Sequence, residues 1–599
     1  MPVGEPAFVL ASLEKAWEDL QTEFEIVMRI PDKQTLLLFA RFVMMSKINH
    51  FMRGVPPSLL KDFLKKFELV QRRVWEAICG IPHASYTDGS GREAEEYRVS
   101  FDIAKMGTKY GLGLGNVADT QDAAYVASFC AAIPVLRRTL PDFEAVLDYE
   151  LAKQRALQDG LSYDDSAYPG HTSLAVSEFV SAVLRLECVS EKKVSMESLL
   201  ARCKDGDKGL RGLQRSLSHY AKEKRVACVR EYLRQHPDPR LLVQFSGGEG
   251  VRESAWVTAL LTDVGGRMSS DLFSCACRRR CLLRQPLDVL PRGAKCVCSK
   301  HPEVDDYGFH LQMCKFCNVF TIETHDTIKK LMHQFFKWGG MNSTMEPSGL
   351  FAVSSLMASA AGPAAVPVPA ATVPTAAADD GEETTGSSVH EQLCVFPPEE
   401  DDAVSVVSSC VDNKRVDLLV RVPGQLDHIY DVQITNAAQE KFKFQGEKAV
   451  DCALYSKETD KRKKYGQSAE RANFKFSPLI LEVGGRMGDA FRLVYESVLQ
   501  KVSSETEVPV PVLDRFWSVR LSVALQGSVS RQVLTRAGHV RKAFFGGRPD
   551  LHNEINDDIL RQQERFDFEG GSHLQEARRS FVAVHHPREA AVQVPGRSV

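Results

Sequence analysis

The chain has 599 residues, which is long enough for about three or four domains. It is 44% apolar and 26% charged, and its formal net charge is −3. With so little net charge, it can bind nucleic acid only through a local basic patch. It lacks a run of about 18 apolar residues, and acidic residues interrupt its N-terminal segment, so we expect neither a membrane span nor a secretory signal. Its 15 cysteines are too sparse for a disulfide scaffold, which favours reduced thiols or metal ligands in the nucleus or cytoplasm.

Helical patterns dominate the first half of the chain. Apolar residues recur there at helical spacing, for example at Leu60, Phe63 and Phe67, as they do on the buried face of an amphipathic helix. We therefore expect an all-helical region at 9–150 and a helical connector at 151–290.

A dense group of cysteines and histidines follows. Its members are Cys296, Cys298, His301, His310, Cys314 and Cys317. Zinc takes four nitrogen or sulfur ligands in a tetrahedron, and the pattern CxC followed by HxxxC supplies them. His310 and Cys314 are four residues apart, so both face the same side of a helical turn. We expect a zinc knuckle at 291–318 with Cys296, Cys298, His310 and Cys314 as ligands, and His301 and Cys317 as reserves.

A second cysteine group precedes the knuckle. Cys275, Cys277 and Cys281 occur in the sequence SCACRRRC without a fourth partner nearby. This pattern is more typical of a helix with buried thiols and an exposed arginine run than of a metal site. The basic stretch at 278–284 would then be able to neutralise phosphates.

The segment 415–435 predicts a β-hairpin, because two β-branched, apolar runs flank a Pro-Gly turn. Asp417 lies on the first run, and Asp431, Gln433 and Thr435 share one face of the second. Two acids on neighbouring strands can meet at the sheet edge, where Mg²⁺ or Mn²⁺ takes carboxylate oxygens. The alternative is that each Asp ends a strand or lies on a solvated face.

Helices and a further strand surround this hairpin. An amphipathic helix carrying His325 precedes it, and a helix with a basic end carrying Lys461, Lys464 and Tyr465 follows it. A strand at 479–483 and another helix come next. The expected order is therefore helix, strand, strand, helix, strand, helix.

Two segments lack the composition of a packed core. Residues 352–392 are rich in Ala, Pro, Val and Thr with an acidic patch, which predicts a flexible insertion inside a domain at 319–540. Residues 541–599 are polar and weakly periodic, so we expect a loosely ordered tail.

This order of elements resembles the PD-(D/E)XK nuclease core. More narrowly, it looks like the restriction-enzyme-like endonuclease at the C-terminus of non-LTR retrotransposon polyproteins, which combines a zinc knuckle, a His-bearing helix, two Asp strands and a later Lys and Tyr. The matching positions here are His325, Asp417, Asp431, Lys461 or Lys464, and Tyr465, after the knuckle. The resemblance implies a multidomain α+β protein with an N-terminal all-helical region, a small zinc knuckle and a PD-(D/E)XK-type α/β nuclease core.

The helical region at 9–150 also resembles a segment of those polyproteins, the thumb that follows the polymerase core. The chain departs from the family in two ways. Tyr163 is followed directly by Asp164 and Asp165, without the intervening residue of a polymerase motif, so we expect no polymerase activity. Gln433 stands where the simplest nuclease motif has Lys, so a lysine of the following helix must supply the charge.

The resemblance implies a metal-dependent DNA endonuclease, derived from a retroelement and lacking its polymerase. Lys464 or Lys461 would orient water and stabilise charge on the phosphate, Gln433 would position water or phosphate, and Tyr465 would touch the DNA backbone. Glu346 or Glu323 could add a carboxylate, although each is more typical of an ordinary acid at a helix end or in a loop. DNA, retroelement RNA, Mg²⁺ or Mn²⁺ and Zn²⁺ are the expected partners, with no membrane.

Three alternatives stay open at this point. The chain could be a catalytically inactive nucleic-acid-binding remnant of the same retroelement, a reading that Gln433 favours. It could also be a structural α/β protein of unrelated descent. His325 could be a structural histidine, because a helix histidine near an apolar stripe usually is.

Overall fold

The structure is a computed structural model that describes residues 5–81, 91–163, 173–204, 210–260, 264–300, 302–316, 318–348, 350 and 415–546. The expected insertion at 352–392 lies outside the described residues, as does nearly all of the expected tail at 541–599. His301, Cys317 and the acidic pair after Tyr163 lie outside this part of the chain as well.

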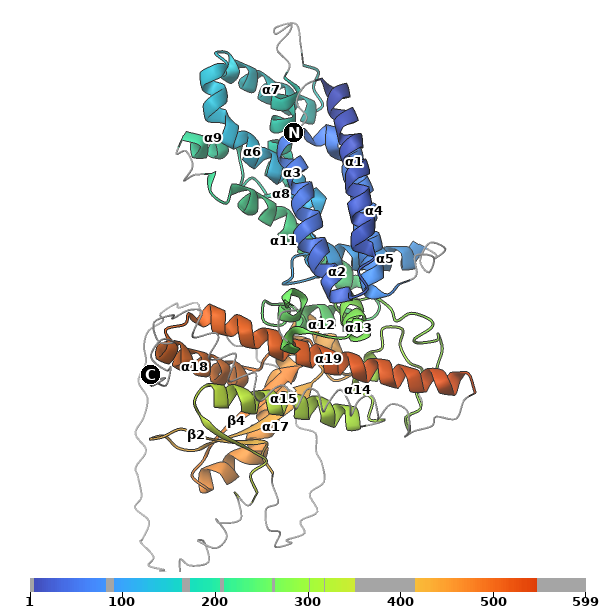
Figure 1. The fold of residues 1–599 in the computed structure, drawn as a ribbon, viewed down its shortest axis with the longest axis vertical. Helices are drawn as coiled ribbons and strands as arrows, with labels where there is room; N and C mark the ends of the chain where they lie inside the picture. The colour runs from blue at the N-terminus through green and yellow to red at the C-terminus, as the bar shows by residue number, and fades with distance from the viewer. Residues whose placement is uncertain are drawn as a thin grey trace, which may run out of the picture.

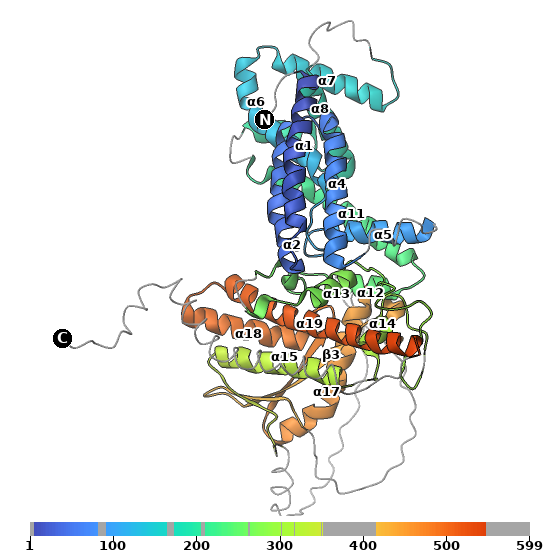
Figure 2. The ribbon, with the colours of Figure 1, turned by 45° about the vertical axis from the view of Figure 1, so that its right-hand side comes forward.

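The first half of the described chain forms an elongated helical lobe, drawn in blue to green in the upper part of Figures 1 and 2. Its helices are α1 (Pro6–Met28), α2 (Lys33–Phe39), α3 (Met45–Gly54), α4 (Pro57–Cys79), α5 (Gly91–Lys105), α6 (Val117–Thr139), α7 (Phe143–Gln158), α8 (Leu174–Val189), α9 (Met196–Lys204) and α11 (Leu213–Gln235). A π-helix, η1 (Ala40–Met44), joins α2 to α3. The expectation of a helical N-terminal region is confirmed.

Two apolar cores hold the helical lobe together. Helices α1–α4 share the first, in which the rings of Trp17 and Phe63 meet edge to face with centroids 5.5 Å apart. Helices α6–α11 share the second, in which Phe129 stacks on Phe179 at 4.3 Å. Residue 150 lies inside α7, within this second core. The expected division between 9–150 and 151–290 therefore does not coincide with a break in packing.

The second half folds around a small sheet, in the lower part of Figure 1. Its helices are α12 (Arg240–Gly247), α13 (Ser270–Arg280), α14 (Phe309–Met313), α15 (Val319–Trp338), α17 (Ala449–Arg471), α18 (Asp489–Thr506) and α19 (Val510–Phe544). Its strands are β1 (Asn342–Met345), β2 (Leu418–Arg421), β3 (His428–Thr435) and β4 (Lys475–Glu482). The described chain is thus mostly helical, with one four-stranded mixed sheet. Helix α19 runs past residue 540, the expected end of this domain.

The sheet contains the expected hairpin. The strand order is β1-β2-β3-β4, and all neighbours are antiparallel except the parallel pair β3 and β4. Between β2 and β3, the N–H of Gln425 donates to the carbonyl of Val422 at 3.1 Å, with Pro423 and Gly424 between them. Gly424 has a φ of 77°, which glycine adopts without strain at this position of a type II turn.

Helices cover both faces of the sheet. α15, α18 and α19 pack against the face that carries Tyr430 and Val432, whereas α17 packs against the opposite face through Tyr465, near Leu419 and Ile429. Strand residues alternate between these two layers, as period-two geometry requires. No helix of the described segments is long and apolar enough to cross a membrane.

Candidate functional site

Cys296, Cys298, His310 and Cys314, the cysteine–histidine cluster, come together between α13 and α15. The two N-terminal cysteines lie on a loop, His310 lies on α14, and Cys314 follows that helix directly. The four ligand atoms all lie within 4.8 Å of one another. This cluster could hold a metal ion, because its side chains are of the types that ligate transition metals.

The spacing of the cluster suits tetrahedral zinc. Cys296 Sγ lies 3.5 Å from Cys314 Sγ, and Cys298 Sγ lies 3.7 Å from His310 Nε2. Ligands held by zinc at about 2.0–2.3 Å stand about 3.3–3.8 Å apart at tetrahedral angles. The contacts with Cys296 and then His310 hold the pKa of Cys314 well below its usual range, which favours the thiolate that binds metals.

Local hydrogen bonds place His310 in the cluster. Gly308, at a φ of 77°, precedes α14, and the carboxylate of Asp305 accepts the N–H groups of Phe309 and His310, both at 2.9 Å. These two donors have no partner inside a helix that has just begun. Asp305 therefore fixes the start of the short helix that presents the histidine ring.

Helix α19 anchors the other end of the knuckle. Arg536 is only 2% exposed and donates to the carbonyls of Leu311 at 2.6 Å and Phe316 at 3.1 Å. Val533 and Ala537, on the same helix, pack in one core with the buried cysteines of the cluster. The knuckle is therefore part of the sheet-bearing lobe.

The arginine run inside the second cysteine group, between Cys277 and Cys281, is largely buried, which corrects the expectation of an exposed phosphate-binding face. Arg278 is 5% exposed and donates to the carbonyl of Cys79 at 2.6 Å. Arg280 is half-buried and donates to the carbonyl of Thr108 at 2.8 Å. Both guanidinium groups therefore donate to backbone carbonyls of the protein and do not form an exposed surface for phosphates. The thiols are buried, as expected, at Cys275, Cys277 and Cys281.

Asp417 lies in the bend that leads into β2. Its Oδ2 accepts the backbone N–H of Val432 at 2.7 Å and lies 3.1 Å from Nε2 of His325 on α15. Its own N–H donates to the carbonyl of Tyr430 at 3.1 Å. The carboxylate is therefore held between two strands and a helix, and these contacts engage one of its two oxygens.

His325 is surrounded by acceptors. Its Nε2 lies 3.1 Å from both Asp417 Oδ2 and the carbonyl of Val432, and its Nδ1 lies 3.1 Å from Asp326 Oδ1. Only the doubly protonated ring donates from both nitrogens. The hydrogen bond to Asp417 accordingly raises the pKa of His325.

Asp431 lies within β3, only 5% exposed, and forms an ion pair with Lys461 of α17. Burial raises the pKa of Asp431, the ammonium of Lys461 opposes this rise, and the charge of Asp417 adds to it. Tyr465 lies one turn after Lys461, and burial together with the charge of Asp431 raises its pKa to about 12. Its hydroxyl donates to the carbonyl of Arg415 at 2.9 Å.

Lys464 and Gln433 do not join this arrangement. Lys464 is exposed, and its ammonium lies 4.7 Å from the centroid of the Tyr465 ring. Gln433 is half-buried beside Ile480 of β4, and no hydrogen bond from it to either acid is found among the described residues. The structure therefore brings Lys461, rather than Lys464, to the acid on β3.

The two candidate additional carboxylates have other partners. The carboxylate of Glu346 pairs with Lys329, although its N–H donates to the carbonyl of Asp417 at 2.8 Å. Glu323 pairs with an arginine of α19. Within the described ranges, the cysteine–histidine cluster is the one group of three or more such ligands. Asp417 and Asp431 therefore do not belong to such a group in the described part of the chain.

The residues that orient His325 were not predicted from the sequence. Asp326 accepts from the ring and also pairs with Lys329, three residues later, at 2.8 Å. Such acid–lysine pairs three residues apart stabilise a helix surface. An acid and a lysine at this spacing beside a candidate histidine is the signal that could have revealed them.

Comparison of the sequence with protein-family models and with curated proteins finds no match.

Proposed function

We propose that this protein is a metal-dependent DNA endonuclease, the nuclease portion of a retroelement-derived protein without its polymerase. The observation that carries the proposal is the contact of Lys461 with the buried carboxylate of Asp431, beside the His325–Asp417 pair. Two carboxylates and an ammonium at the end of one strand pair match what hydrolysis of a phosphodiester requires.

Asp417 and Asp431 would hold one Mg²⁺ or Mn²⁺, since carboxylate oxygens suit such hard cations. The cation supplies Lewis acidity toward the phosphate. A water molecule loses a proton to solvent as its oxygen forms a bond to phosphorus. The bond from phosphorus to a sugar oxygen breaks, and that oxygen leaves as a hydroxyl after taking a proton from solvent. Lys461 stabilises the charge that develops on the phosphate oxygens.

The remaining residues position these groups. His325 holds Asp417 through Oδ2, so the other oxygen would be available to a cation. Tyr465 keeps α17 against the start of β2 through its bond to Arg415. The cysteine–histidine cluster takes Zn²⁺ and fixes the chain that enters α15. Target DNA is the substrate, and RNA of the same element is a second partner.

A second candidate function has a specific observation in its favour. Gln433 occupies the position where the simplest nuclease motif has Lys, and the ammonium of Lys461 is already paired with Asp431. A protein in which this pair never opens would bind nucleic acid without cutting it. This is the inactive remnant of the same retroelement.

Nicking of supercoiled plasmid DNA with Mg²⁺ or Mn²⁺ separates the two functions. Loss of one electrostatic contact to the reacting phosphate costs about 10²–10³ in rate, so we expect such a loss for Lys461→Ala and none for the matched control Lys464→Ala. Asp431→Asn should be inactive. Equal nicking by the wild type and Asp431→Asn would refute the nuclease, and an absence of nicking by the wild type would favour the remnant.

A further inference from the structure

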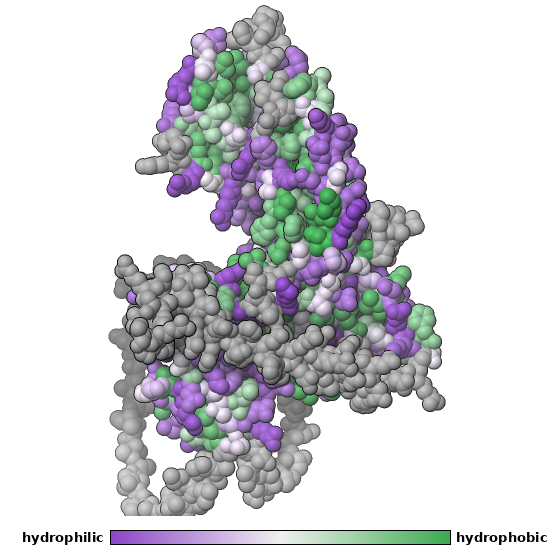
Figure 3. Space-filling model, in the orientation of Figure 1, coloured by the Kyte–Doolittle hydropathy of each residue, from purple (hydrophilic) through white to green (hydrophobic). Residues whose placement is uncertain are grey.

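A cavity of about 820 Å³ opens in the helical lobe, away from both sites described above. Helix α3 and the first half of α11 line it on two sides, and the segment between α5 and α6 and the start of α6 line the rest. On the face drawn in Figure 3, hydrophilic side chains gather on this lobe next to the indentation that separates it from the sheet-bearing lobe.

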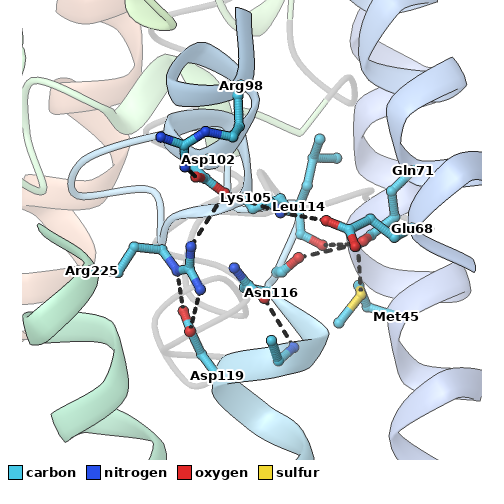
Figure 4. A network of polar contacts seen from close by, with 12 residues as sticks. Met45, Glu68, Gln71, Arg98, Asp102, Lys105, Leu114, Asn116, Asp119 and Arg225 are labelled. Carbon is cyan, nitrogen blue, oxygen red and sulfur yellow. Dashed lines mark hydrogen bonds and ion pairs between the residues drawn. The ribbon is translucent and has the colours of Figure 1, made fainter. Parts of the chain in front are cut away.

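The lining of the cavity is strongly cationic. Seven Arg and Lys side chains line it, against the two carboxylates of Asp119 and Glu223. Two of the seven are paired with acids of the same lobe, as Figure 4 shows, and a third, Lys109, pairs with Glu249 at 3.5 Å. Lys105 pairs with acids of α4 and α5, and Arg225 binds Asp119 with two hydrogen bonds of 2.7 and 2.8 Å.

Several of the other cations lack an acidic partner. Arg53 donates to the amide oxygen of Gln214 at 2.7 Å, and Lys222 donates to the hydroxyl of Ser218 at 3.3 Å. Within the part of the chain that is described, no carboxylate forms an ion pair with Arg53, Arg215 or Lys222. All three are exposed. Their uncompensated charge favours a ligand with several negative groups.

Asn116 lines the cavity and carries an unused hydrogen-bond donor. Its Oδ1 caps α6 by accepting the N–H of Ala118 at 2.9 Å, which fixes the orientation of the amide. Its Nδ2 is buried and has no hydrogen-bond partner, although the residue is only 5% exposed. Figure 4 shows this nitrogen between Arg225 and Lys105 without a dashed line. A buried donor of this kind is costly unless an acceptor reaches it.

Apolar and aromatic groups lie beside the charges. Met45, Ala124 and Val226 line the same cavity. Tyr110, which is half-buried, lines it as well. Phe42, which follows the lining residue Arg41 on the π-helix, is 59% exposed, and the guanidinium of Arg41 lies 5.0 Å from the centroid of its ring. Charged grooves with exposed aromatic rings are typical of sites for single-stranded nucleic acid, because the phosphates meet cations and the bases meet rings.

We propose that this cavity binds a single strand of nucleic acid, with phosphates at Arg53, Arg215 and Lys222 and a ligand oxygen at Asn116. Pockets of about 300–1,000 Å³ hold small ligands, so this cavity accommodates a few nucleotides of one strand and excludes a duplex. Binding here requires neither the cation nor Asp431 of the nuclease.

The test is fluorescence anisotropy of the full chain with a short labelled DNA or RNA oligonucleotide, without added Mg²⁺. The triple variant Arg53→Gln, Arg215→Gln, Lys222→Gln should bind at least about tenfold more weakly. Since each single-strand phosphate contact contributes about 0.7 to the slope of log affinity against log salt, the slope should fall by about 2. The matched control is Lys15→Gln, Lys61→Gln, Lys65→Gln, with the same charge change on exposed positions of α1 and α4.

An absence of oligonucleotide binding, or an equal loss of affinity in both triple variants, would overturn the proposal. Asn116→Asp keeps the cap of α6 but removes the donor, so it should weaken binding while thermal unfolding stays near that of the wild type. Unchanged affinity in Asn116→Asp would remove Asn116 from the site. If an equimolar mononucleotide displaced the oligonucleotide, the cavity would bind single nucleotides and not a strand, which would contradict the proposal. The binding assay contains no Mg²⁺ and measures no nicking, so its outcome is read independently of the nuclease test.

Discussion

The carboxylate of Asp431 is nearly removed from solvent, because the residue is only 5% exposed. An isolated charge in such a place costs several kcal/mol, and burial accordingly raises the pKa of Asp431. The ion pair with Lys461 offsets this cost. In the nuclease proposed above, a divalent cation bound to this carboxylate would take the place of the ammonium of Lys461, which would then be available to a phosphate oxygen.

The pair between His325 and Asp417 predicts a stability that depends on pH. The pKa of His325 is raised above its ordinary value of 6.5, so the pair stabilises the fold fully below about pH 6.5 and loses its effect as the pH rises through the folded-state pKa. His325→Gln should therefore lower the thermal midpoint of unfolding at pH 5.5 by more than at pH 8.5. The expected contribution is about 1 kcal/mol at this part-exposed position.

His333 on the same helix is the matched control with the opposite sign. Burial lowers the pKa of His333, so its contribution is present above about pH 6.5 and is lost as the pH falls. The midpoint difference between the wild type and His333→Gln should shrink toward acid, whereas that of His325→Gln should grow. If the midpoint differences of both variants changed in the same direction with pH, the hydrogen bond from protonated His325 to Asp417 would be contradicted.

At the scale of elements, long and periodic segments could be predicted from the sequence. Helix α15 has the expected buried stripe, and the Pro-Gly turn gave the hairpin of β2 and β3. Strand β1 could not be predicted, because its four residues, Asn342–Met345, are mostly polar and pair with a strand beyond the insertion. Its stability comes from that distant pairing.

The choice between Lys461 and Lys464 depended on the phase of α17. The buried residues of this helix include Leu454, Glu458 and Tyr465, and a helical repeat of 3.6 residues places Lys461 on their face. Lys464 falls outside this face. All four residues of the KRKK run are basic, so the run itself does not indicate which of them faces the sheet. Tyr465 and the alanines near it are apolar enough to indicate the buried face of the helix.

The cysteine–histidine cluster predicts a bound metal. The purified protein should contain about one equivalent of zinc by elemental analysis, as a four-ligand structural site does. Cys314→Ser should reduce this to nearly none, because the tetrahedron then lacks a thiolate, whereas Cys188→Ser, at an exposed cysteine of α8, should retain it. Metal-free wild-type protein, or full zinc content in Cys314→Ser, would contradict the site.

At the scale of the whole molecule, the arginines of α13 connect the two lobes. Arg278 reaches the end of α4, where it donates to the carbonyl of Cys79, and Arg280 reaches the segment after α5 through the carbonyl of Thr108. Their composition suggested a phosphate-binding face, because a sequence does not show which basic residues meet backbone carbonyls after folding. These arginines of the sheet-bearing lobe instead donate hydrogen bonds to backbone carbonyls of the helical lobe.

Two single variants should distinguish an arginine that joins the two lobes, Arg278, from one that binds nucleic acid in the cavity, Arg215. Arg278→Met removes a buried donor, so it should lower the free energy of unfolding by about 1–3 kcal/mol, seen as a lower thermal midpoint, and leave the salt dependence of oligonucleotide binding unchanged. Arg215→Met removes an exposed cation of the cavity, so it should leave the midpoint unchanged and reduce the salt slope by about 0.7. If Arg278→Met reduced that slope as much as Arg215→Met, its guanidinium would contact nucleic acid, and the junction between the lobes would have to open on binding.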